Sequence, residues 1–192
     1  MKNLSKASLV LLLILGFGLR ANAQQLAIKT NLPYWLTASP NIGAEYSVGD
    51  RVSLELTAGF NPFNFGDEKL LKHWVVWPEV RYWFDNTYNG HFVGIHAVGG
   101  QFNLSGWDIP ISVLDNLKTR RYKGSAIGAG FSYGYQWELS DKWGLEVTLG
   151  LGFVRFNYES FTLGDNPVRL IEDEKNYFGP TKGAFSLIYY LD

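Results

Sequence analysis

Residues 124–139, with the sequence GSAIGAGFSYGYQWEL, alternate between two kinds of side chain. Every second position from Ser125 to Leu139 is mostly apolar or aromatic, and the positions between them are mostly small or polar. A period of two is that of a β-strand, in which successive side chains point to opposite faces of a sheet. The stretch therefore predicts a strand with one large apolar face and one small, polar face.

The same alternation recurs along the chain and is clearest at residues 51–61 and 143–153. Helical spacing is nearly absent, so we predict an all-β protein. The pattern predicts eight strands, at residues 25–36, 40–48, 51–61, 73–84, 90–103, 124–139, 142–157 and 176–191. Pro33, Pro78 and Pro180 each predict a local pairing defect inside a strand, because proline has no backbone N–H.

The predicted connections alternate between short turns and long loops. The short turns are residues 49–50, 85–89 and 140–141, and the long loops are residues 62–72, 104–123 and 160–175. The first connection, near residues 37–39, is also short but lies at the end with the loops. An even number of strands with short turns at one end is typical of bacterial outer-membrane barrels. The predicted fold class is an eight-stranded antiparallel up-and-down transmembrane β-barrel, with both termini at the end of the short turns.

The first 23 residues have the features of a secretory signal peptide. Lys2 and Lys6 give a positive start, and residues 9–15 form an apolar core that is too short to span a bilayer. Small residues follow and end at Ala23. We therefore predict that residues 1–23 are a cleaved signal peptide, and that residues 24–192 form a barrel in the outer membrane.

Composition excludes several other functions. The 192 residues include no cysteine, which excludes disulfides, thiolate metal sites and a cysteine nucleophile. Basic and acidic residues nearly balance, at 17 and 18, and this argues against a nucleic-acid partner.

The polar face of the strands is too small, and too poor in lysine and glutamate, for a water-facing surface. It suits the interior of a narrow barrel, with the aliphatic face toward outer-membrane lipid. Alternation then predicts seven lumen charges: Lys29, Glu45, Glu55, Glu79, Arg81, Glu146 and Lys182. Arg51 lies on the same face at the rim and is expected to balance them. We favour a paired network that fills the barrel over a proton or ion path, because buried charges are tolerated when they are paired.

Aromatic residues gather at the predicted strand ends, as they do at membrane interfaces. The predicted belt at the end of the short turns comprises Tyr82, Phe84, Tyr135, Trp137, Trp143 and Tyr189. The predicted opposite belt comprises Tyr34, Trp35, Phe60, Trp74, Phe102, Phe153 and Tyr158. The alternating apolar residues of the last strand, from Phe185 to Leu191, are the pattern that barrel-assembly machinery recognises, so this machinery is an expected partner during insertion.

Several short phrases carry a family resemblance over nearly all of residues 24–192. The most specific are PEVRYWF at residues 78–84 and YFGPTK at residues 177–182. KTNL at 29–32, PNIG at 40–43, HW at 73–74, NGHF at 89–92 and GYQW at 134–137 accompany them. The chain resembles a family of exported Bacteroidota proteins described as a domain of unknown function. The resemblance implies an outer-membrane barrel, with some members encoded near fimbrial genes, and it implies no catalytic residues.

No motif in the sequence supports catalysis or cofactor binding. His73, His91 and His96 lack the spacing of metal ligands, and no short motif pairs one of them with a serine. We therefore predict no catalytic, cofactor or metal site, and no enzyme activity.

The predicted long loops are better candidates for function, because loops on a rigid scaffold carry recognition. The candidate contacts in the loop at 104–123 are Trp107, Lys118, Arg120, Arg121 and Lys123. The loop at 160–175 is acidic, so the two loops either pack on each other or form a docking surface for a surface partner or anionic lipopolysaccharide.

The resulting functional prediction is a structural, anchoring or surface-binding barrel that serves a fimbrial or other surface assembly. A lipid-modifying barrel enzyme, similar to a lipid A deacylase or acyltransferase, is the alternative from another class. A small-solute channel is the third.

Overall fold

The computed structural model describes residues 26–66, 68–107, 117–164 and 166–191. Its elements are β1 (Leu26–Asn31), α2 (Leu32–Leu36), β2 (Asn41–Gly49), β3 (Val52–Asn61), β4 (Leu70–Trp83), β5 (Gly90–Ser105), β6 (Arg120–Ser140), β7 (Trp143–Thr162) and β8 (Arg169–Leu191). The predicted signal peptide at residues 1–23 lies outside the described residues. Among those residues, no helix is both long and apolar enough to cross a membrane.

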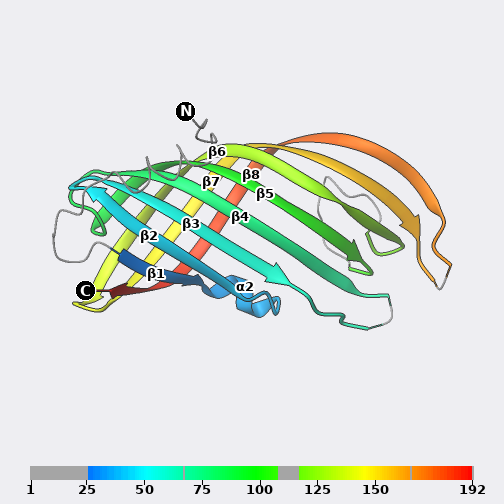
Figure 1. The fold of residues 1–192 in the computed structure, drawn as a ribbon, viewed down its shortest axis with the longest axis horizontal. Helices are drawn as coiled ribbons and strands as arrows, with labels where there is room; N and C mark the ends of the chain where they lie inside the picture. The colour runs from blue at the N-terminus through cyan, green and yellow to red at the C-terminus, as the bar shows by residue number, and fades with distance from the viewer. Residues whose placement is uncertain (1–25, 67, 108–116, 165, 192) are drawn as a thin grey trace, which may run out of the picture.

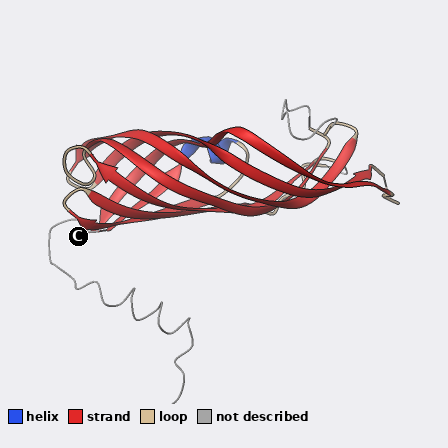
Figure 2. Ribbon diagram, turned by 90° about the horizontal axis from the view of Figure 1, so that it is seen from above, coloured by secondary structure: helices blue, strands red, loops and turns tan. Residues whose placement is uncertain are grey.

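The eight strands form a closed barrel, as predicted (Figures 1 and 2). Each strand pairs with the next in antiparallel order, and β1 closes the ring against β8 from Leu26↔Leu191 to Asn31↔Ser186. The short turns that follow β2, β4 and β6 lie at the same end as the C-terminus, which we call the turn end. The opposite end is the loop end. The predicted up-and-down order is therefore confirmed.

Burial follows the alternation of the sequence. Leu54 is 46% exposed on the outer face of β3, whereas its neighbour Glu55 is 4% exposed inside the barrel. The same contrast holds between Val80 and Arg81 on β4. The small, polar face therefore fills the lumen and the large apolar face covers the outside. This arrangement is the reverse of a soluble domain, whose apolar side chains gather inside.

The strands are very unequal in length, which makes the barrel lopsided. β1, β2 and β3 have 6, 9 and 10 residues, whereas β6, β7 and β8 have 21, 20 and 23. Figure 1 shows β4–β8 continuing past β1–β3 as a curved sheet. We call its β5–β8 part the extension, residues 101–105, 120–125, 155–162 and 169–176. The loops predicted at 104–123 and 160–175 are therefore too long, because strand pairing continues where the apolar alternation of the outer face ends.

The first predicted strand, residues 25–36, is also corrected. β1 ends at Asn31, and Pro33 lies in the first turn of α2. Proline suits that position, because the first turn of a helix needs no internal N–H donor and proline holds the helical φ. The other two predicted defects are confirmed. The β7–β8 register shifts beside Pro180, and the β4–β5 pairing is interrupted at Pro78 without a change of register.

Candidate functional site

All seven predicted lumen charges meet in one cluster inside the barrel. Their side chains come from six strands, and each is at most 7% exposed. The strands can place them together because inward positions alternate along every strand. The cluster contains four carboxylates and three cationic groups, so its formal charge is negative by one. Arg51 does not join it: this residue is exposed in the turn between β2 and β3, which corrects its predicted role.

Lys29 and Arg81 form the centre of the cluster. The Nζ atom of Lys29 donates to Glu146 Oε2 at 2.7 Å and to Glu55 Oε2 at 3.1 Å, and it also pairs with Glu45. Arg81 contacts all four carboxylates. Its Nη1 lies 2.9 Å from Glu45 and 2.8 Å from Glu146, its Nη2 lies 2.5 Å from Glu55, and its Nε lies 3.0 Å from Glu79. Every charge therefore has an opposite partner, as burial requires.

Lys182 extends the cluster toward the loop end. It donates to Glu55 Oε1 at 2.8 Å and also pairs with Glu79. Four hydroxyl groups complete the shell of the carboxylates: those of Ser53, Thr57, Ser132 and Thr148 donate to Glu45, Glu55, Glu79 and Glu146 respectively. The sequence prediction missed these donors, although all four lie on the same alternating face as the charges.

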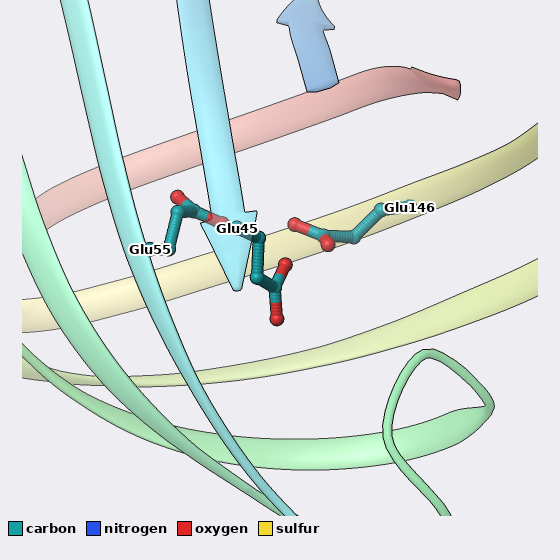
Figure 3. Close-up of side chains that lie close together, drawn as sticks. All are labelled: Glu45, Glu55 and Glu146. Carbon is teal, nitrogen blue, oxygen red and sulfur yellow. The ribbon is translucent and has the colours of Figure 1, made fainter. Parts of the chain in front are cut away.

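Three of the carboxylates also lie close enough together to hold a metal ion. Glu45, Glu55 and Glu146 have oxygens within 4.8 Å of one another (Figure 3). Lys29 and Arg81 already donate to all three, so cationic side chains occupy the place that a metal would take. The geometry identifies the cluster as a structural ion network.

An aromatic layer closes the lumen at the turn end. Trp83, Tyr88, Phe92 and Tyr190 pack there with Ala27 and Ile188. The hydroxyl of Tyr88 donates to the Glu45 carbonyl at 2.9 Å, and the Gln136 amide donates to the Tyr88 carbonyl and the Tyr190 hydroxyl. Burial raises the pKa of Tyr88 in the turn after β4. The guanidinium carbon of Arg81 lies 4.2 Å from the centre of the Phe92 ring, which joins this layer to the charge cluster.

A cavity of about 380 Å³ lies on the loop side of the charge cluster. Its floor includes Lys29, Glu55, Glu146 and Lys182. Tyr34 and Trp77, which meet edge to face with ring centres 5.8 Å apart, form part of its wall. Pro180, Thr181, Gly183 and Ala184 of β8 line the other side. The volume falls in the range of about 300–1,000 Å³ that is usual for small-molecule sites.

The three histidines lie in separate places. His73 Nδ1 is 2.9 Å from the Leu71 carbonyl, His91 Nδ1 is 2.6 Å from the Tyr133 hydroxyl, and His96 Nε2 is 2.8 Å from the Thr181 hydroxyl. None of these hydrogen bonds joins a histidine to a serine, which is the pairing that nucleophilic hydrolysis by a serine needs. The geometry of the histidines therefore gives no support to the lipid-modifying enzyme.

The six residues of the predicted turn-end belt all lie on the outer face of the barrel. Tyr82 packs on Phe84, Tyr135 on Trp137 and Trp143 on Tyr189. Trp83, between two of them, instead turns into the lumen, as alternation requires. At the loop end, Trp35, Phe60, Trp74 and Phe153 are exposed, whereas Tyr34, Phe102 and Tyr158 face inward. The opposite belt is therefore smaller than the sequence predicted.

The candidate outer-loop contacts divide into two groups. Trp107 packs against Phe65 and donates to the Leu70 carbonyl at 3.0 Å, so it is fixed to the start of β4 and the loop before it. Arg120, Arg121 and Lys123 belong to β6, while Lys118 lies just before it and is exposed. Of the acidic residues in the predicted loop at 160–175, Glu172, Asp173 and Glu174 are in β8, where Glu172 pairs with Arg169 and Glu174 with Arg155. The fourth, Asp165, lies outside the described residues.

These features define a closed, eight-stranded up-and-down barrel whose lumen is filled by paired charges and aromatic rings. The family model described as "Protein of unknown function (DUF3575)" matches residues 9–191. The chain belongs to this family, and the predicted resemblance to a domain of unknown function is confirmed. The Bacteroidota origin and the fimbrial link stay predictions. A comparison with curated proteins finds no match.

Proposed function

We propose that the protein is an outer-membrane barrel that serves as an anchor and presents its extension as a surface-binding platform. One observation carries the membrane assignment. The outer face of β7 is apolar at every second residue from Trp143 to Phe153 and then becomes polar at Arg155, Asn157 and Glu159. Residues 143–153 match the ~9–11 residues that a tilted strand needs to cross a bilayer.

The extension beyond this apolar band supports the binding role. Its outer face carries a polar hollow of about 620 Å³, lined on β6–β8 by Lys123, Ser125, Asn157, Glu159, Glu172 and Glu174. Its inner face is aromatic, with Tyr122 packed beside Phe102, Phe156, Tyr158 and Tyr177. A sheet stiffened by such packing can hold a recognition surface away from the membrane. Its partner under this proposal is a protein of a fimbrial or other surface assembly.

The filled lumen supports an anchor over the alternative of a small-solute channel. An eight-stranded barrel has an interior just wide enough for its own side chains, and here seven charges and an aromatic layer occupy it. In this role the barrel contributes a rigid attachment to the membrane, and the extension contributes specificity.

Epitope insertion tests this arrangement on intact cells. An epitope after Gly164, in the loop between β7 and β8, is expected to bind antibody without permeabilisation. A matched epitope between Asp141 and Lys142, in the turn between β6 and β7, is expected to bind only after the outer membrane is opened. Equal staining at the two positions, or recovery of the protein in the soluble fraction, would overturn the proposal.

A further inference from the structure

The barrel wall has a break beside β8. β1 has only six residues, and its pairing with β8 ends at Asn31↔Ser186, whereas β8 continues to Arg169. α2 takes the place of a longer β1 (Figure 1). The edge of β8 on the loop side of Ser186 therefore has no strand beside it within the described part of the chain.

Side chains stabilise this break. The Asn31 Nδ2 donates to the Gly183 carbonyl at 3.1 Å, and the Phe185 N–H donates to Asn31 Oδ1 at 3.1 Å. The Trp77 Nε1 donates to the Thr181 carbonyl at 3.4 Å, and Pro180 has no N–H to satisfy. Exposed backbone groups are costly in hydrocarbon unless they find such partners. The opening can therefore persist within the apolar band.

The cavity reaches the outside of the barrel through this break. Its lining runs from the inward-facing Lys182 and Glu55 to Leu149, whose side chain lies on the outer face and is 69% exposed. Gly183 pairs with Leu149, and a Cβ atom added to Gly183 would meet nothing within 4 Å. Leu149 lies in the middle of the apolar run at 143–153, so the opening faces the hydrocarbon layer under the proposed function.

We propose that this opening is a lateral entrance for a single-chain amphiphile with an ammonium head group. The alkyl chain would pass Gly183 and lie against Tyr34, Trp77 and Pro180. The head group would reach the floor, where Glu55 and Glu146 lie beside Lys29 and Lys182. This inference rests on the proposed function, because the ligand enters from lipid.

The charge of the lumen selects the head group. Four glutamates face two lysines and one arginine there, which leaves one carboxylate in excess. An ammonium group would neutralise the cluster, whereas a carboxylate head would add a second uncompensated charge. Because unbalanced charge is costly in a buried site, the cationic amphiphile is expected to bind more tightly than the anionic one of equal chain length.

Photo-crosslinking tests the entrance directly. The full protein is inserted into phosphatidylcholine vesicles and illuminated with a dodecyl-trimethylammonium probe that carries a diazirine in its chain. Mass spectrometry is expected to find the label on peptides containing Trp77 and residues 180–184. Unlabelled dodecyl-trimethylammonium is expected to compete, and dodecanoate is expected to compete far more weakly.

Two glycine variants separate the entrance from general contact with lipid. Gly183→Phe places a ring on the outer face, at the mouth of the break, and is expected to lower labelling of Trp77 about tenfold or more. Gly99→Phe is the matched control, since a Cβ atom at this β5 glycine also meets nothing within 4 Å. It is expected to leave labelling unchanged.

Equal labelling of the Gly183→Phe and Gly99→Phe variants would overturn the entrance. A label that is found on outward-facing residues alone would overturn it too. Equal competition by dodecanoate would overturn the charge selection. Heat-dependent gel mobility of the same samples separates this inference from the proposed function. A barrel that shows the mobility shift but no label in the cavity contradicts the entrance alone, whereas a protein without the shift contradicts the membrane barrel itself.

Discussion

Arg81 contacts all four carboxylates of the lumen, and it is the only cationic group of the described cluster that does so. Lys29 contacts three of them and Lys182 contacts two. Removing one partner from a buried ion network leaves uncompensated charge, which costs more than the pair itself contributes. The stability of the barrel is therefore expected to depend on Arg81 more than on any surface charge.

Arg81→Ala is expected to lower the free energy of unfolding by about 3–5 kcal/mol, because four buried carboxylates would share two lysines. The measurement is the temperature at which the compact gel band of the unboiled protein converts to the unfolded band. Arg169→Ala is the matched control, since Arg169 pairs with Glu159 and Glu172 on the exposed extension. Its effect is expected to be small, and equal conversion temperatures for the two variants would contradict the central role of Arg81.

The lumen charges could be predicted residue by residue because alternation decides which side chains face inward. The same rule identifies Trp83 as a lumen residue, although its place beside Tyr82 and Phe84 suggests a membrane belt. Alternation gives no distances, so the contact of Arg81 with every carboxylate could not be read from the sequence. Alternation also could not show that Arg51 lies outside the network, because the position of Arg51 depends on the geometry of a tight turn.

At the scale of single elements, β7 marks the edge of the apolar band. Leu151→Arg, inside the band, is expected to cost about 2–4 kcal/mol and to reduce the amount of barrel recovered in the membrane. Asn157→Arg, three positions further along the same outer face, is expected to be tolerated, because that residue lies in the polar hollow. Recovery of heat-modifiable protein from the membrane fraction measures both. Equal loss in the two variants would show that the band does not end near Arg155.

Asn31 connects β1, α2 and the edge of β8. Asn31→Ala would leave the Gly183 carbonyl and the Phe185 N–H without their partners, at a cost of about 1–3 kcal/mol for each group. The conversion temperature is expected to fall, while Asn176→Ala, on the exposed part of β8, should leave it nearly unchanged. An unchanged temperature in the Asn31 variant would mean that these groups are satisfied in another way.

The number of strands and the positions of most turns could be predicted, but strand lengths could not. In the membrane-facing region an apolar outer face and a polar inner face give a clear period of two. In the extension the outer face becomes polar, as at Arg155, Asn157 and Glu174, and the inner face carries aromatic rings, so the apolar outer face that marks the other strands ends although the backbone pairing continues. The cavity also could not be predicted from the sequence, because it depends on the shortness of β1 and on the shift of register beside Pro180.

For the whole molecule, the filled lumen predicts an electrically silent barrel. Purified protein reconstituted into a planar bilayer is expected to give no stable single-channel steps, because the ion network and the aromatic layer occupy the path between the two ends. A bilayer that receives the same detergent without protein gives the baseline conductance. Reproducible steps of one size would favour the small-solute channel over the anchor.

The gel mobility of membrane-extracted protein, with and without boiling, tests the central claim most directly. A closed barrel with an apolar exterior stays compact in detergent until heated, so the unboiled sample is expected to migrate faster than the boiled one. Protein that is recovered in the soluble fraction and shows one mobility under both conditions would contradict the account. Its apolar outer face would then have to be covered by something other than lipid.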